Sequence, residues 1–288
     1  MSLPVHWVES LSGVRPGEPV EVAGDEAHHA VAVRRLRAGE QVVLTDGRGT
    51  LVRGTVIETG RRRLVVQADG MQTVPLPTPS FTVVQALPKG DRGELAVEVL
   101  TEVGVATVVP WAAARSVAVW RGERATKSLA RWRSTAHEAA KQSRRAWFPD
   151  VVDLATTEDV AGLLSTADVA VVLHEAAELP PSGVAVPSTG SVVVVVGPEG
   201  GLTDEELAAF AEVGALGVRL GAEVLRTSTA GVAAVSALLA RSPRWGLTRL
   251  PSAGELAQDE GAVPDGRSRG RDHARVLRQR LASTRCGN

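Results

Sequence analysis

The strongest constraint on the fold is a run of five valines, Val192–Val196, that leads directly into the sequence GPEGG. Side chains along a strand alternate between its two faces, so a strand that is apolar at every position has to be covered on both faces. Strands of this kind belong to parallel sheets that carry helices on both sides. The run therefore predicts an α/β domain with a buried, mostly parallel sheet.

The segment 81–246 continues this alternation of strands and helices. Strands are predicted at 81–87, 107–109, 169–173, 192–196 and 217–220, and helices at 91–103, 127–147, 157–164, 203–213 and 229–240. Alternating elements of this kind are typical of one sheet with helices on both faces. We therefore assign 81–246 to a single α/β domain.

The first 73 residues show a different pattern. Short β-branched runs at 20–22, 41–45, 51–57 and 63–67 are separated by turn residues, and one short helix is predicted near 25–36. This pattern predicts a small β-barrel domain over residues 1–73. Residues 74–80 hold three prolines in seven positions and predict a stiff linker. Residues 247–288 are rich in glycine, serine, proline and charge, which predicts a disordered basic tail.

Composition excludes several classes of protein. The chain has 288 residues and a net charge of −1, and its only cysteine, Cys286, can form neither an internal disulfide nor a cysteine-based zinc site. The sequence holds no secretory signal and no apolar stretch of about 18 residues, so we expect a cytoplasmic protein that does not enter a membrane. Charge is uneven, however: residues 121–145 hold eight Lys or Arg and two acids. Such a segment can bind phosphates or form an ordinary solvated helix face.

The GPEGG sequence lies where the valine strand ends, which is where open α/β sheets bind ligands. Neither a Walker loop nor a dinucleotide fingerprint is present. Glu199, Asp204 and Glu205 would repel a phosphate, so an uncharged or cationic ligand is favoured over a nucleotide. Thr203 and Glu206 have the spacing of a capping box that starts a helix. A purely structural turn between strand and helix remains the alternative.

Two further strand ends carry similar loops. Leu220 opens the sequence LGAEVLRTSTAG, in which Ser228 or Thr229 is predicted to cap the last helix, and residues 173–175 read Leu-His-Glu. Because parallel strands end at one edge of the sheet, three such loops predict a pocket.

GPEGGLTDEE followed by LGAEVLRTSTA resembles the signature of the SPOUT methyltransferases, and within them the bacterial 16S ribosomal RNA uridine-N3 methyltransferase family. The sequence HHAVAVRRLRAGEQVVLTDGRG resembles the PUA-like RNA-binding domain of that family, and KGDR its motif after the first catalytic-domain strand. The resemblance covers about residues 5–245. It implies an N-terminal PUA-like β-barrel domain and a C-terminal SPOUT α/β domain with a deep trefoil knot. It also implies a homodimeric enzyme that uses S-adenosylmethionine and acts on 16S ribosomal RNA in the small ribosomal subunit.

The resemblance implies that the loops at the strand ends hold the cofactor. The residues concerned are Leu173, His174, Glu175, Gly197, Pro198, Glu199, Gly200, Gly201, Leu220, Gly221, Leu225, Arg226, Thr227 and Ser228. RNA contacts are expected from His29, Arg34, Arg35, Arg37, Lys89, Arg92 and Arg145, although a surface role is an equal alternative for each arginine and lysine. No metal site is expected.

Two residues are catalytic candidates for transfer of a methyl group to uridine N3. N3 carries a proton near neutral pH, so the protein needs a base or a cation that stabilises the uridine anion. Arg226 suits the second role, with an ion pair to Glu199 or Glu223 as the alternative. Glu199 is a candidate base, alongside Glu175 and His174.

Three positions depart from the family pattern. Arg34 stands where the family often has leucine, and Lys141 and Ser228 stand where it often has glutamate. The serine excludes the family carboxylate at 228 as the base. Other functions stay open at this point: a SPOUT enzyme that modifies a ribose 2'-OH or a tRNA, a non-catalytic RNA-binding protein, and an unrelated nucleotide-binding α/β enzyme.

Overall fold

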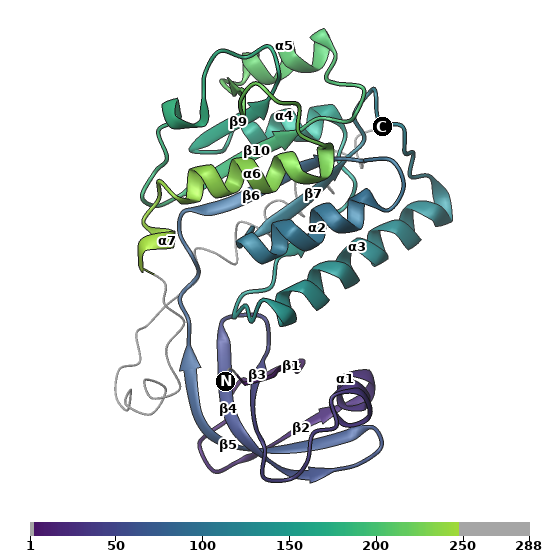
Figure 1. The fold of residues 1–288 in the computed structure, drawn as a ribbon, viewed down its shortest axis with the longest axis vertical. Coiled ribbons are helices and arrows are strands. Elements are labelled where there is room, and N and C mark those ends of the chain that lie inside the picture. Colours follow the sequence, from purple (N-terminus) through teal and green to yellow (C-terminus); the bar gives the residue numbers. More distant parts are fainter. Residues whose placement is uncertain (1–2, 248–288) are drawn as a thin grey trace. The chain divides into compact units, whose positions relative to one another are not determined.

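The computed structural model describes residues 3–247, which divide into two compact units (Figure 1). Unit 1 comprises residues 3–76 together with Lys141–Phe148, and unit 2 comprises Pro77–Ala140 together with 149–247. Apart from Leu247, the predicted tail over 247–288 lies outside the described residues.

Unit 1 is built on a five-stranded mixed sheet of order β1-β3-β4-β5-β2. Its strands are β1 (Val5–Trp7), β2 (Pro19–Ala23), β3 (Gln41–Thr45), β4 (Thr50–Thr59) and β5 (Arg63–Thr73). β1 pairs with β3 in parallel and the remaining pairs are antiparallel. α1 (Gly24–His28) continues into the π-helical turn η1 (His29–Val33). The four predicted strands and the helical segment are confirmed, whereas β1 was not predicted.

The segment Lys141–Phe148 belongs to unit 1, although it begins with the last two residues of a helix (Gly122–Gln142) that otherwise belongs to unit 2. Ala146 accepts the backbone N–H of Gly49 at 2.9 Å, and Phe148 donates its N–H to Gly47 at 2.9 Å. The indole of Trp147 donates to the carbonyl of Val74 at 2.9 Å. The segment therefore adds to the sheet at the turn between β3 and β4.

Unit 2 contains a six-stranded sheet of order β11-β9-β10-β6-β7-β8, in which every pair is parallel. The strands are β6 (Ser80–Ala86), β7 (Thr107–Trp111), β8 (Asp150–Val151), β9 (Val169–Leu173), β10 (Ser191–Val196) and β11 (Leu216–Val218). β10 is buried at every position, as the valine run predicts. β8 was not predicted because it has only two residues.

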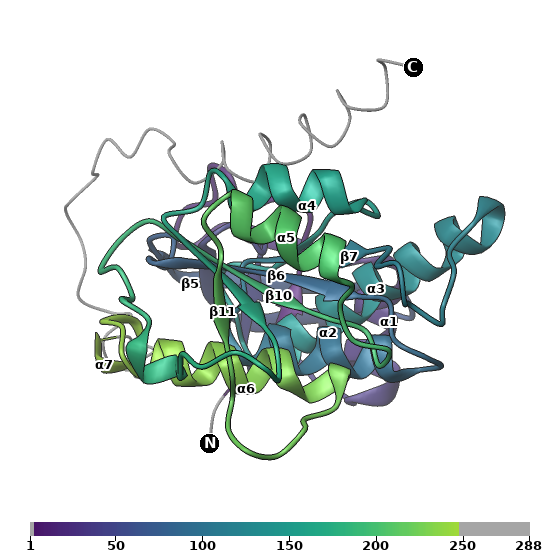
Figure 2. The same ribbon diagram turned by 90° about the horizontal axis from the view of Figure 1, so that it is seen from above.

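Helices cover both faces of the sheet, as Figure 2 shows. One face packs against α2 (Arg92–Val103), α3 (Gly122–Gln142) and α6 (Thr227–Leu239), through residues such as Leu100, Trp132 and Leu238. The other face packs against α4 (Thr157–Leu164) and α5 (Asp204–Glu212), where Phe210 meets Trp111 edge-on at 5.5 Å between ring centroids. No helix in the described range 3–247 is long and apolar enough to cross a membrane.

Two predicted helix boundaries are wrong. α3 spans Gly122–Gln142 instead of the predicted 127–147. It ends before 147 because Arg144 adopts a left-handed φ of +56° and the chain turns to pair with unit 1 residues. α6 begins at Thr227 with Arg226 as its N-cap residue, so Ser228 and Thr229 lie inside its first turn and cap nothing.

Candidate functional site

The three polar strand ends meet at the carboxyl edge of the unit 2 sheet. β10 and β11 both pair with β9, with Val195 opposite Val172 and Val218 opposite Leu173. This order places the loops that follow them next to one another: 173–175 after β9, 197–201 after β10 and 220–228 after β11. The structure thus brings together the segments that contain all the predicted cofactor-binding residues.

The GPEGG sequence forms a tight turn between β10 and α5. Gly201 donates its N–H to the carbonyl of Pro198 at 3.0 Å and has a left-handed φ of +73°, which favours glycine. The predicted capping box follows: the Thr203 hydroxyl accepts from the N–H of Glu206 at 3.2 Å, and the Glu206 carboxylate accepts from the N–H of Thr203 at 2.9 Å. The turn leaves Gly200 and Gly201 exposed, so their backbone is open to a ligand.

The edge of the sheet carries exposed acids. Glu175, Glu199 and Glu223 belong to the three loops and are exposed. The N–H of Glu205 and the Thr203 hydroxyl lower the pKa of the Glu205 carboxyl and so favour its ionised form. This negative surface suits a cationic ligand better than a phosphate. Within residues 3–247, no group of three or more His, Cys, Asp or Glu side chains is arranged to hold a metal ion.

The two catalytic candidates occupy different surroundings. Arg226 is exposed and forms no ion pair with Glu199 or Glu223 among the described residues, so the ion-pair alternative is not observed. Glu199 accepts the backbone N–H of Lys89 at 3.3 Å, which connects the β10 loop to the loop after β6. The Glu199 carboxylate therefore has a structural contact, whether or not it also acts as a base.

Sequence reasoning did not predict the contacts that three polar residues make near this edge. Gln85 lies near the end of β6 and is fully buried, with its Nε2 donating to Ala86 at 3.1 Å. Glu206 is buried within the capping box, and Arg115 donates to the carbonyl of Leu202 at 3.1 Å. The lone glutamine in the apolar run FTVVQAL was an available signal for Gln85. Glu206 and Arg115 each contact residues that are more than 80 positions away in the sequence. The residues next to them in the sequence therefore do not indicate these contacts.

The predicted RNA-binding residues fall into two groups. His29, Arg34, Arg35 and Arg37 lie in or just after η1, and Arg145 lies in the added segment Lys141–Phe148, so these five belong to unit 1. Lys89 and Arg92 belong to unit 2, where they follow β6, and the N–H of Lys89 contacts Glu199 of the GPEGG turn. In the first group Arg35 has a left-handed φ of +57°, an uncommon backbone state for a residue other than glycine.

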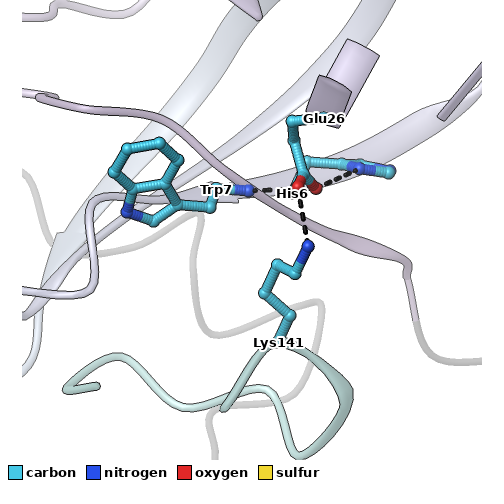
Figure 3. A network of polar contacts seen from close by, with 4 residues as sticks. All are labelled: His6, Trp7, Glu26 and Lys141. Atoms are coloured by element: carbon cyan, nitrogen blue, oxygen red, sulfur yellow. Dashed lines mark hydrogen bonds and ion pairs between the residues drawn. The ribbon is translucent and has the colours of Figure 1, made fainter. Parts of the chain in front are cut away.

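A buried charge network holds the added segment in unit 1, as Figure 3 shows. The Lys141 ammonium donates to Glu26 Oε2 at 2.7 Å, and His6 Nδ1 lies 3.1 Å from Glu26 Oε1. Side-chain exposure is only 12% for Glu26 and 11% for Lys141. Burial by itself raises the pKa of Glu26, but the hydrogen bonds from His6 and Lys141 and their charges outweigh it and lower the pKa to about 2. Lys141, one of the departures from the family pattern, thus fastens 141–148 to α1.

We expect this network to make the stability of unit 1 depend on pH in the acid range. The pKa of Glu26 is below its ordinary value of 4.5, so its stabilisation is complete above 4.5 and is lost as pH falls toward 2. Glu26→Gln should destabilise unit 1 by about 2 kcal/mol at neutral pH, and the difference from wild type should shrink by about half near pH 3. Amide hydrogen exchange of residues 24–33, corrected for intrinsic rates, measures both values.

Glu21→Gln is the matched control, because Glu21 pairs with Arg63 on the surface with about half of its side chain exposed. Its effect should stay below about 1 kcal/mol. Equal losses in the two variants would contradict a special role for the buried network.

Residues 75–239 match the family model of an RNA methyltransferase domain, and residues 22–69 match that of an RNA methyltransferase PUA domain. Ribosomal RNA small subunit methyltransferase E of Mycobacterium tuberculosis is 45% identical over 233 residues, which cover 80% of this chain and 89% of the relative. The Bacillus subtilis protein of that name is 31% identical over 227 residues, with 75% and 88% covered.

Fold and sequence together define an RNA methyltransferase with a PUA domain. The chain belongs to the ribosomal RNA small subunit methyltransferase E family. The predicted family resemblance is therefore confirmed.

Solved structures agree with this assignment. A methyltransferase from Legionella pneumophila in complex with S-adenosylmethionine has a TM-score of 0.77 at 25% identity, with 84% of this chain and 99% of that chain covered. Ribosomal RNA small subunit methyltransferase E from Neisseria gonorrhoeae, bound to S-adenosylmethionine, has a TM-score of 0.74 at 25% identity, with 84% and 98% covered. The predicted fold class, a PUA-like barrel followed by a SPOUT α/β domain, is confirmed, while the trefoil knot stays a prediction.

Proposed function

We propose that this protein transfers a methyl group from S-adenosylmethionine to N3 of a uridine in 16S ribosomal RNA of the small ribosomal subunit. The supporting observation is the meeting of the GPEGG and LGAEVLRT loops at one edge of a parallel sheet, in a chain of this family. The test is methyl transfer to small ribosomal subunits, followed by mapping of the modified nucleotide. A product methylated on a ribose or on tRNA would contradict the proposed substrate.

The residues at the carboxyl edge fit S-adenosylmethionine. A Cβ at Gly201 would meet only Arg115 Nη1, at 3.9 Å, so the turn leaves open space beside its backbone. Exposed carboxylates in the three loops suit the positive sulfonium and ammonium groups. Leu173, Leu220 and Leu225 supply apolar surface at the same strand ends. We propose that residues 173–175, 197–201 and 220–228 hold this cofactor.

When bound, the cofactor supplies an electrophilic methyl group. The protein has to bring unpaired uridine N3 to that group and accommodate the loss of the N3 proton. Arg226 carries a guanidinium group, which can hold the negative charge that develops on the uridine O2 or O4. The N3 proton passes to solvent or to one of Glu199, Glu175 and His174. Ser228 offers no carboxylate for this step, in contrast to the family pattern.

RNA binding is proposed to use the basic residues of unit 1, because Arg35 and Arg145 belong to the same compact unit. Changing both to alanine should weaken RNA binding and reduce its salt slope by roughly one for each lost phosphate contact. Cofactor affinity should hardly change. Filter binding of a 16S ribosomal RNA fragment over a salt series measures the slope.

The control variant changes Arg62 and Arg63 to alanine in the same unit. It removes two positive charges that already pair with acids: Arg62 with Asp25, and Arg63 with Glu21 and Glu58. Equal salt slopes of RNA binding in the two double variants would show that Arg35 and Arg145 are ordinary surface residues and do not contact RNA phosphates.

The assembly is proposed to be a homodimer of knotted domains, as the family resemblance implies. Val224 is 81% exposed and Leu225 beside it is 40% exposed, so the loop 220–228 offers apolar surface to a second copy. Light scattering at micromolar concentration tests the dimer, and an active monomer would contradict it.

A further inference from the structure

Glu206 connects two loops of unit 2 that are far apart in sequence. It is 3% exposed and uses both carboxylate oxygens. Oε2 accepts the N–H of Thr203 at 2.9 Å within the capping box of α5, and Oε1 accepts the N–H of Ala114 at 2.8 Å. Ala114 lies in the loop 112–121 after β7, whereas Thr203 ends the GPEGG turn after β10. One buried carboxylate therefore fastens the β7 loop to the cofactor loop.

A second capping box in the same unit shows that this contact is not needed to start a helix. At α4, Asp159 accepts the N–H of Thr156 at 2.9 Å through Oδ2 alone, and the Thr156 hydroxyl accepts the N–H of Asp159 at 3.2 Å. Aspartate is thus long enough to complete a box. The additional methylene of Glu206 gives the carboxylate the reach that it uses on Ala114.

Arg115 makes a second connection between the same two loops. Its guanidinium Nη1 donates to the carbonyls of Gly200 at 3.3 Å and Leu202 at 3.1 Å. The backbones also approach closely, because a Cβ at Gly200 would lie 3.0 Å from the Cβ of Arg115 and 3.1 Å from its carbonyl oxygen. The glycine is therefore needed for contact with the β7 loop as well as for an open turn.

The loop 112–121 has the composition of a substrate-facing segment. It follows β7, which neighbours β6, and β6 in turn neighbours β10. The loop therefore borders the proposed cofactor loops, which follow β9, β10 and β11, but is not one of them. It carries Arg121 and two exposed valines, Val117 at 61% and Val119 at 51% exposure. Cationic and apolar side chains together suit an unpaired nucleotide, which has a phosphate and a base face.

We infer that Glu206 and Arg115 are positioning residues that fix the loop 112–121 against the GPEGG turn. In this position the loop presents the RNA nucleotide to the methyl donor. This inference rests on the proposed function. A displacement of about 1 Å between reacting groups costs up to 100-fold in rate, so two loops that meet at a reaction centre need a rigid connection. Both residues act through the backbone of the two loops: Glu206 accepts from Thr203 and Ala114, and Arg115 donates to Gly200 and Leu202.

Glu206→Asp separates the two roles of the carboxylate. The shorter side chain should keep the capping box, as Asp159 does, and lose the contact with Ala114. We expect kcat for methylation of small ribosomal subunits to fall about tenfold, equivalent to about 1.4 kcal/mol, while the Kd for S-adenosylmethionine stays within about threefold of wild type. Arg115→Lys should act in the same direction, because one ammonium group cannot reproduce the geometry of the guanidinium.

The matched control is Asp159→Asn, which weakens the capping box of α4 and leaves both loops untouched. It should lower thermal stability as much as Glu206→Asp and leave kcat unchanged. If the control loses as much kcat, or if Glu206→Asp raises the cofactor Kd more than tenfold with kcat preserved, the inference is overturned.

Hydrogen exchange of residues 112–121 in the ligand-free protein decides the inference independently of activity. Faster exchange in Glu206→Asp than in Asp159→Asn supports the connection, and equal exchange overturns it. Wild-type protein that neither binds S-adenosylmethionine nor methylates RNA would instead contradict the proposed function.

Discussion

Replacing Arg226 by alanine should lower kcat about 100-fold while the Kd for S-adenosylmethionine changes by less than about threefold. Arg226 is exposed in the loop 220–228 and forms no ion pair among the described residues, so its charge is available to the uridine anion. Loss of one preorganised group that stabilises a developing oxyanion costs about 10²- to 10³-fold. Single-turnover methyl transfer at saturating RNA and cofactor measures the effect.

The pH dependence distinguishes this role from simple RNA binding. If Arg226 stabilises the uridine anion, the alanine variant should recover part of its rate at alkaline pH, where more uridine is already deprotonated. Added guanidinium ion should also restore activity. A variant that loses RNA affinity with kcat unchanged would assign Arg226 to binding instead.

Gly201→Val is the second variant with a large expected effect. The residue has a left-handed φ of +73°, and a branched side chain there would both strain the turn and occupy the open space beside it. We expect cofactor affinity to fall at least tenfold, or about 1.4 kcal/mol. Isothermal titration calorimetry with the folded variant measures the loss.

Gly214→Val controls for backbone strain. Gly214 lies beyond the other end of α5, has a φ of +83°, and would place a Cβ where no atom lies within 4 Å. It should lose comparable thermal stability and keep its cofactor affinity. If both variants lose affinity equally, strain in α5 explains the effect, and the placement of the cofactor at Gly201 is wrong.

Most of the unit 2 fold could be predicted because a sheet that is buried on both faces requires strands with apolar residues at consecutive positions. The bounds predicted for β9 and α4 match the structure, and Val192–Val196 falls within β10. The capping box of α5 was predicted as well, because Thr203 and Glu206 act within one turn. Local spacing and apolar pattern are sufficient for features of this kind.

Features that depend on contacts distant in sequence were missed. β1 has three residues, and its pairing with β3 joins Val5 to Val43. The capping residue of α6 was misplaced because Ser228 and Thr229 have the right chemistry for a cap, whereas the helix begins at Thr227 and Ser228 is buried within its first turn. Nothing near Glu206 in the sequence points to Ala114, 92 positions away.

Within residues 3–247, unit 1 is formed by two stretches of sequence, which has a consequence for synthesis. The chain leaves the barrel after Leu76, returns to it at Lys141 and departs again after Phe148. The first 76 residues by themselves therefore lack Lys141, one of the two side chains that pair with Glu26, and the Trp147 indole that bonds to Val74. The barrel can complete its hydrogen bonds only when α3 has been translated, so an expression fragment that ends at the prolines would exclude residues that the barrel needs.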